Sequence, residues 1–162
     1  MNTTPEPVAT PTRLPPRWFI RIAWVVHRAV YRFGGRGLRK PTADLFGMLR
    51  VRTKGRRSGA ERLAILAYYE DGPDLIGIAM NGWGALEPAW WLNLKAHPDA
   101  SVDLVDGKRN VHAREAQGQE RNRLWARWAH YDKNLDRSAL HRPGETAVVI
   151  FEPAPPRINA NP

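Results

Sequence analysis

The chain has 162 residues, of which 43% are hydrophobic and seven are tryptophan, a composition that suits one domain with a sizeable core and argues against disorder. It has no cysteine, which excludes disulfides, thiol nucleophiles and cysteine-ligated metals. The net charge of +9 is uneven, because residues 1–62 hold 14 Lys and Arg against three acids whereas residues 63–162 hold 11 against 13. The basic front part needs a negatively charged partner, such as a membrane surface, a nucleic acid or an anionic cofactor.

Residues 1–40 are the first part of this basic region. Residues 1–16 are rich in Pro and Thr and predict a flexible tail. Residues 17–40 predict an amphipathic helix, over about 17–33, followed by a linker. The basic face of that helix is Arg17, Arg21, Arg28 and Arg32, and its apolar stripe is Trp18, Ile22, Val25, Val26, Ala29 and Phe33.

Two interpretations of this helix stay open. It lies in an anionic membrane interface, or it packs on the core of its own domain. Arginines interrupt every long apolar run, which argues against a membrane-spanning helix and a secretory signal. We therefore expect a cytoplasmic protein, peripheral at the inner face of the cell membrane if the first interpretation holds.

The remainder of the chain is dominated by strand-like segments. They are residues 47–54, 62–69, 74–80, 100–106, 108–115 and 145–152. Asp71-Gly72 and Asp106-Gly107 predict hairpin turns, and residues 88–96 and 118–131 predict helices. Six strands and few helices predict an α+β fold built on a small, mostly antiparallel barrel over residues 41–153, followed by a flexible tail over 154–162.

The connection between the first two predicted strands has the composition of an anion-binding loop. It contains Gly55 and Gly59, which permit positive φ and inward-facing backbone N–H groups, together with arginines whose forks suit phosphate. An ordinary hairpin with a basic, solvated tip explains the same residues equally well. No Gly-Lys-Ser/Thr follows at the spacing of a Walker loop.

Further motifs follow this loop along the chain. Taken in order, Gly55–Gly59, Asn81–Gly84, Pro88–Pro98 and Glu145–Pro153 resemble the deazaflavin (F420)-dependent nitroreductases, an actinobacterial family of split-barrel oxidoreductases. The resemblance covers about residues 17–153. It implies a split β-barrel of the flavin-reductase type, coenzyme F420 as cofactor and an enzyme that passes a hydride to a quinone or a similar planar acceptor. The lack of any recognisable protein nucleophile or metal-binding histidine pair agrees with cofactor-based chemistry.

The resemblance also implies which residues contact the cofactor. They are Lys54, Gly55, Arg56, Arg57, Ser58 and Arg62 on the phosphate-holding loop, Leu63, Ala64, Ile65 and Leu66 on the strand along the deazaflavin, Ile78, Ala79, Met80 and Asn81 at the other ring edge, and Ala89, Trp90, Trp91, Leu92 and Asn93 on the helix beside it. His130 and Tyr131 are candidate proton donors. From the residues alone, we would expect Trp90 and Trp91 to be core residues and Asn93 to cap or bridge a turn.

The chain departs from the family pattern on the substrate side. Ile65 stands where proline is common and Met80 where serine is common. Asp132, Leu135 and Ser138 occupy the positions of the tyrosines that cover the substrate in nitro-drug-activating members. We therefore expect reduction of quinones rather than of nitroimidazoles.

Three other classes of function are compatible with parts of the sequence. They are a non-catalytic relative that binds a fatty acyl chain, the same barrel holding FMN, and a nucleic-acid-binding module. The last is disfavoured because no motif here belongs to a nucleic-acid-binding fold. The oligomeric state is open, since split barrels occur as dimers and as monomers.

Overall fold

The computed structural model describes residues 37–155, so the helix predicted over residues 17–33 and the tail over 1–16 lie outside the described residues. The elements in chain order are β1 (Gly47–Lys54), β2 (Glu61–Asp71), β3 (Asp74–Ile78), α2 (Ala89–Ala96), β4 (Asp99–Leu104), β5 (Gly107–Glu115), α3 (Gly118–Tyr131), α4 (Leu135–Ala139) and β6 (Val148–Pro153). The predicted strands, the helices over 88–96 and 118–131 and the mostly antiparallel barrel are confirmed, whereas α4 was not predicted.

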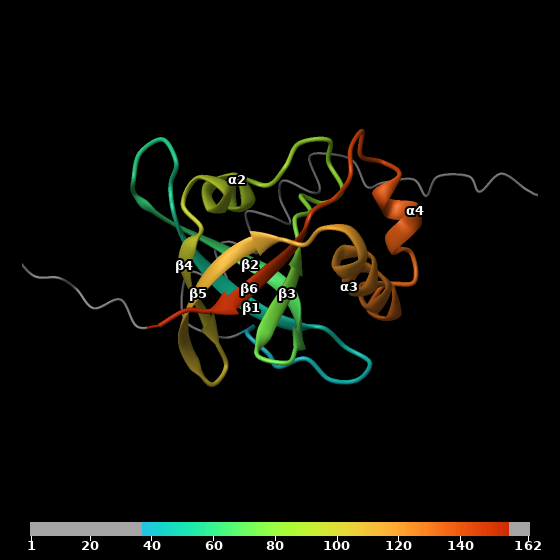
Figure 1. The fold of residues 1–162 in the computed structure, drawn as a ribbon, viewed down its shortest axis with the longest axis horizontal. Coiled ribbons are helices and arrows are strands. Elements are labelled where there is room, and N and C mark those ends of the chain that lie inside the picture. Colours follow the sequence, from blue (N-terminus) through green and yellow to red (C-terminus); the bar gives the residue numbers. More distant parts are fainter. Residues whose placement is uncertain (1–36, 156–162) are drawn as a thin grey trace, which may run out of the picture.

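The six strands form one closed antiparallel barrel in the order β1-β2-β3-β6-β5-β4 (Figure 1). The barrel closes where β1 pairs with β4, with Val51 opposite Val102. The last strand, β6, enters between β3 and β5, so the C-terminal segment pairs with strands from the middle of the chain. The predicted hairpin turns at Asp71-Gly72 and Asp106-Gly107 connect β2 to β3 and β4 to β5, and both glycines have positive φ.

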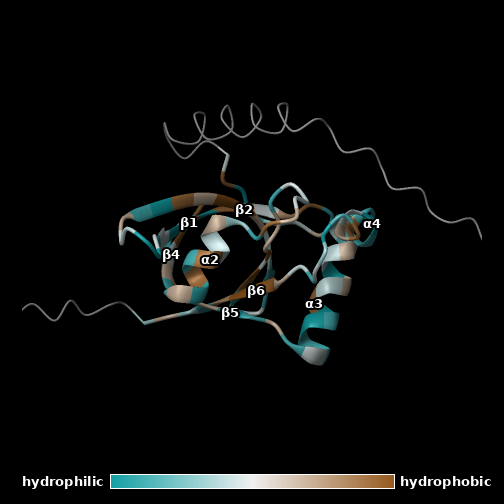
Figure 2. Ribbon diagram, turned by 90° about the horizontal axis from the view of Figure 1, so that it is seen from above, coloured by the Kyte–Doolittle hydropathy of each residue, from teal (hydrophilic) through white to brown (hydrophobic). Residues whose placement is uncertain are grey.

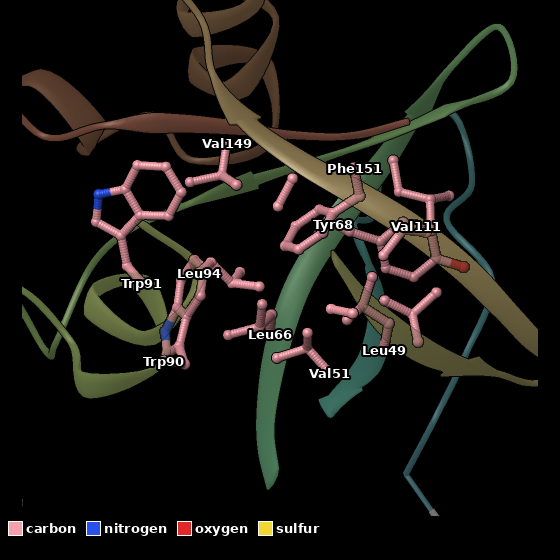
Figure 3. Close-up of a cluster of buried hydrophobic side chains, with 14 of the residues drawn as sticks. Leu49, Val51, Leu66, Tyr68, Trp90, Trp91, Leu94, Val111, Val149 and Phe151 are labelled. Atoms are coloured by element: carbon pink, nitrogen blue, oxygen red, sulfur yellow. The ribbon is translucent and has the colours of Figure 1, made fainter. Parts of the chain in front are cut away.

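The interior of the barrel is filled by apolar side chains from the strands and from α2, which lies across one end of it (Figures 1 and 3). Leu49, Val51, Tyr68 and Phe151 point inward and are at most 1% exposed. Trp90, Trp91 and Leu94 of α2 join the same cluster. The barrel is therefore a packed core that α2 closes at one end.

A second apolar cluster lies between the outer face of the barrel and helices α3 and α4. Val148 and Ile150 of β6 belong to it, whereas Val149 and Phe151 belong to the interior cluster. Both faces of β6 are thus covered over residues 148–151, which explains why this part of the strand is continuously apolar, as the brown of β6 in Figure 2 shows. On α3, Leu124 and Trp128 pack against this face, and the hydroxyl of Tyr69 donates to the Leu124 carbonyl at 2.9 Å.

Several strand boundaries differ from the prediction by one to three residues. The strand predicted over 74–80 ends at Ile78, because the Met80 N–H turns back to the Ile78 carbonyl. The strand predicted over 145–152 begins at Val148. Within residues 37–155, no helix is long and apolar enough to cross a membrane.

Candidate functional site

The basic loop between β1 and β2 is held in shape largely by its own backbone. The Gly55 N–H donates to the Ala60 carbonyl at 2.8 Å, and the Gly59 N–H donates to the Gly55 carbonyl at 2.7 Å. Gly59 has a φ of 69°, as predicted, whereas Gly55 does not have positive φ and is instead confined by the Ala60 carbonyl and the Ser58 hydroxyl. Of the two glycines, Gly59 alone therefore has the positive φ that we expected of both.

The tip of this loop keeps its donors available. Among residues 37–155, the N–H groups of Arg57 and Ser58 and the guanidinium of Arg57 have no hydrogen-bond partner. The Ser58 hydroxyl accepts from Arg62 Nη2 at 3.4 Å, which draws the Arg62 guanidinium back toward the loop. The side chains of Arg56, Arg57 and Arg62 all belong to exposed residues. This tip suits an anion with several oxygen atoms.

Asn93 joins the loop to the helix that closes the barrel. Its Oδ1 accepts from the Arg56 backbone N–H at 3.2 Å and from Arg56 Nη1 at 3.3 Å. Its Nδ2 donates to the hydroxyl of Thr53 at 3.2 Å, and that hydroxyl donates to the Arg62 carbonyl at 3.4 Å. Asn93 and Thr53 are 4% and 2% exposed, and both polar atoms of the Asn93 amide are bonded to protein groups. The bridging interpretation of Asn93 is the one the structure supports.

A cavity of about 490 Å³, which we call the loop cavity, lies between the basic loop, the start of β2 and α2. It is lined by Thr53, Gly55, Arg56, Arg57, Ser58, Arg62, Leu63, Ala64, Asn81, Pro88, Ala89, Trp90 and Asn93. Its volume is within the range of small-molecule and cofactor sites. It combines a basic, donor-rich end with a wall of apolar side chains, so it suits a ligand that is flat and apolar at one end and anionic at the other.

A second cavity of about 140 Å³, the aromatic cavity, begins where the loop cavity ends on β2. It is lined by Phe46, Ile65, Leu66, Ala67, Ile78, Met80, Gly82, Trp83, Trp90, Trp128, Asp132 and Leu135. Trp90 lines both cavities, and residues 62–64 and 65–67 of β2 line the first and the second in succession. The two spaces are therefore neighbours along one strand.

The segment after β3 contributes to both cavities and is fixed at two points. Ala79 donates its N–H to the Ala147 carbonyl at 2.9 Å and accepts at its own carbonyl from Arg142 Nη1 at 2.6 Å. Trp83 follows at a φ of 60°, a left-handed conformation that is unfavourable for a bulky residue. The turn that holds it is closed by a bond from the Gly84 N–H to the Asn81 carbonyl at 2.9 Å. The indole of Trp83 is thereby placed at the wall of the aromatic cavity.

Most residues predicted from the resemblance line one of these cavities, and a few lie elsewhere. Lys54 lines a separate polar cavity of about 260 Å³, together with residues of β4 and β5. The residues Ala79, Trp91 and Leu92 are absent from the lining of both the loop and the aromatic cavity, and Trp91 is a core residue at 3% exposure. The candidate proton donors also lie outside both linings, since Tyr131 packs on Tyr69 and His130 is exposed near Asp44.

Several lining residues were not predicted. Thr53 and Pro88 line the loop cavity, and Phe46, Gly82, Trp83 and Trp128 line the aromatic cavity. Thr53 could have been found, because it is a polar residue at an inward position of an alternating strand. The aromatic residues could not, since their meeting depends on how the loop after β3 and the end of α3 fold over the barrel.

Comparisons with known proteins show the family to which the chain belongs. The family described as F420H(2)-dependent quinone reductase matches residues 24–152. The F420H(2)-dependent quinone reductase Rv1261c of Mycobacterium tuberculosis is 32% identical over 117 residues, which cover 67% of this chain and 77% of that protein. A solved structure described as an F420-H2 dependent reductase, FDR-A, superposes with a TM-score of 0.60 at 25% identity and covers 72% of this chain and all of that one. By the extent of these matches, the chain belongs to the F420H(2)-dependent quinone reductase family.

Proposed function

We propose that this protein oxidises F420H2 and reduces a quinone, and that the loop cavity is where the deazaflavin cofactor binds. The observation that carries the proposal is the pairing, in one cavity, of three arginines with an apolar wall formed by Leu63, Ala64 and Trp90. F420 has a flat deazaflavin ring and a chain that bears a phosphate and carboxylates. A cavity with one basic end and one apolar wall fits both parts.

Each part of the chain then has a defined task. Arg57 and the N–H groups at the tip of the basic loop would bind the phosphate, and Arg56 would be oriented for the same purpose by Asn93. Leu63, Ala64 and Trp90 would hold the ring, with the backbone near Asn81 at its edge. When bound, the reduced cofactor supplies the hydride. The role of the protein is to place the two reactants in contact and to exclude water.

The acceptor would occupy the aromatic cavity. Hydride transfer requires the donor and acceptor carbons to be adjacent, and the aromatic cavity adjoins the loop cavity at Trp90. Its apolar walls suit a quinone ring, which needs little charge stabilisation because its reduced anion is delocalised. Neither His130 nor Tyr131 lines this space, so we assign the proton that completes the hydroquinone to water.

We also propose that residues 17–40 bring the enzyme to an anionic membrane surface, where apolar quinones dissolve. The proposal rests on the eight basic residues and no acidic one between Arg13 and Lys40. At the end of this segment, Arg39 is anchored to the barrel by hydrogen bonds to Met48 and Phe46.

Equilibrium titration with oxidised F420 and with FMN, followed by absorbance and fluorescence, tests the cofactor assignment. We expect F420 to bind more tightly than FMN and the Arg57→Ala variant to lose about 1.5–3 kcal/mol of F420 binding, the range for one charge-assisted hydrogen bond. Arg137→Ala, an exposed arginine of α4 that lines neither cavity, is the matched control. Tighter binding of FMN than of F420 would favour an FMN reductase. If neither cofactor binds and lipid co-purifies with the protein, the lipid-binding alternative is favoured.

A further inference from the structure

The aromatic cavity contains one charged group in an otherwise apolar wall. Of the residues that line it, Asp132 is the one that ionises. Its neighbours in the wall include Trp83, Trp128 and Leu135. Within residues 37–155, Asp132 forms no ion pair with a basic side chain. A ligand in this cavity would therefore meet a carboxylate that no basic side chain of the described residues compensates.

The fold needs an oxygen atom at this position but not its charge. Asp132 Oδ1 accepts from the Asn134 N–H at 2.9 Å, a local turn that an amide oxygen would serve equally well. Asp132 is also the C-cap of α3, and its N–H donates to the Trp128 carbonyl at 3.0 Å. The partial charge at a helix C-terminus is negative, so a carboxylate there is electrostatically unfavourable. The negative charge thus has no stabilising task in the structure.

We propose that Asp132 is a specificity-determining residue that makes the acceptor site select neutral quinones and reject acceptors bearing a carboxylate or sulfonate. This inference rests on the proposed function, in which the acceptor occupies the aromatic cavity. The long-range attraction from the net charge of +9 acts in the opposite direction, because it draws anionic acceptors toward the protein. Discrimination against anionic acceptors must therefore come from a charged group in the wall of the acceptor site itself. Asp132 is that group.

The test compares two acceptors under anaerobic conditions with F420H2 as donor, namely 1,4-naphthoquinone and 1,4-naphthoquinone-2-sulfonate. The readout is the ratio of kcat/KM for the sulfonated quinone to that for the neutral one. In Asp132→Asn we expect this ratio to rise about tenfold over wild type, since a repulsion between two charges a few ångströms apart is removed. Using a ratio cancels any effect of the variant on the hydride step, because negative charge develops on both rings.

The matched control is Asp136→Asn, which removes a carboxylate four residues away on α4. Asp136 lies outside the cavity wall, and an amide oxygen would preserve its 2.7 Å contact with the Trp125 indole N–H. We expect the ratio in this variant to stay within about twofold of wild type, because a remote exposed charge is screened. A naphthoquinone that bears a quaternary ammonium group carries a positive charge, which the Asp132 carboxylate would attract. Its kcat/KM relative to that of the neutral quinone is therefore expected to fall in Asp132→Asn.

Two failures are distinguishable. Turnover of the neutral quinone with an unchanged ratio in Asp132→Asn would overturn this inference and leave the proposed function intact. Absence of F420H2-dependent turnover of either quinone by wild type would overturn the proposed function and this inference with it. If Asp132→Asn does not fold, Asp132→Ser also removes the charge while its hydroxyl can accept from the Asn134 N–H, and the same tenfold rise is required of it.

Discussion

Asn93 connects the basic loop to the helix that closes the barrel, through two hydrogen bonds to Arg56. It lies on α2, in the part of the helix that closes the barrel, yet its side chain fixes Arg56 of the loop and Thr53 of β1. The buried amide therefore couples the wall of the loop cavity to its basic end. A small change at Asn93 is expected to affect both stability and cofactor binding.

Asn93→Ala removes an acceptor for the Arg56 N–H and a donor to Thr53 in a buried position. The expected loss in the free energy of unfolding is about 1–3 kcal/mol, because buried polar contacts are broken. F420 binding is expected to weaken roughly tenfold, because Arg56 is no longer held in place. Urea unfolding and an F420 titration measure the two effects, with Asn122→Ala on the exposed face of α3 as control. A destabilised Asn93→Ala variant with unchanged F420 affinity would show that Asn93 has a structural role alone.

For single residues, the sequence predicts which side chains belong to the site better than it predicts the contacts between them. The Gly-Arg-Arg-Ser-Gly motif correctly indicated a loop whose basic residues line a cavity. It could not show that the Arg56 N–H is bonded to Asn93, since that contact joins residues 37 positions apart. Ser138, expected on the substrate side with Asp132 and Leu135, does not line the aromatic cavity, although Leu135 of the same helix α4 does.

At the scale of elements, the closure of the barrel is reinforced by one carboxylate. Asp103 of β4 accepts from Arg50 Nε at 2.6 Å and from Arg52 Nε at 3.0 Å, and both arginines are on β1. Burial of Asp103 opposes its ionisation, but the hydrogen bonds from Arg52 and Arg50 outweigh this effect and lower the pKa of its carboxyl. The side chain of Asp103 is 14% exposed, so these contacts are screened less than surface pairs.

Asp103→Asn is expected to lower the free energy of unfolding at pH 7 by about 1–3 kcal/mol, the range for charge-assisted hydrogen bonds. Because the pKa of Asp103 is lowered in the folded state, its contribution is fully present above about pH 4 and is lost as pH falls through the folded-state pKa. Urea unfolding of both proteins from pH 7 to pH 3 measures this difference. The surface variant Asp106→Asn is the control, and an equal loss of stability in both variants would contradict a special role for the β1–β4 contact.

The elements themselves were largely predictable from local pattern. Alternation predicted β1, and the Asp-Gly pairs predicted the two hairpins. The short helix α4 was missed because its five residues have no apolar periodicity and only Leu135 is buried. The order of strands, with β6 between β3 and β5, cannot be derived from local pattern, because it depends on pairing between distant segments.

At the scale of the whole molecule, the basic front part remains a prediction about membrane contact. A chain that begins at residue 37 retains the bonds of Arg39 to Met48 but lacks six basic residues. It is expected to stay folded and to lose binding to vesicles of anionic lipid, with about 1 kcal/mol lost per basic residue near the surface. Vesicle co-sedimentation measures this, with neutral vesicles as control. Unfolding or precipitation of the shortened chain would indicate that the missing segment belongs to the core.

We infer that this enzyme passes a hydride from F420H2 to a quinone that occupies the aromatic cavity. This cavity lacks the tyrosine hydroxyls of nitro-drug-activating relatives. The aromatic cavity offers Asp132 and Leu135 at those positions, and neither a carboxylate nor an aliphatic side chain donates a hydrogen bond to a developing anion. Loss of such donors costs roughly 10²–10³ in rate each for substrates that need them. A nitro group needs them more than a quinone, whose reduced anion is delocalised over the ring.

The most direct test is anaerobic consumption of F420H2 with menadione and with a bicyclic nitroimidazole, measured side by side on the full chain. We expect measurable quinone reduction, and nitroimidazole reduction that is at least about 10²-fold slower, the effect of one missing donor. Comparable turnover of the nitroimidazole would contradict the role assigned to the aromatic cavity. If menadione does not oxidise F420H2 although the cofactor binds tightly, the assignment as an F420H2-dependent quinone reductase is contradicted.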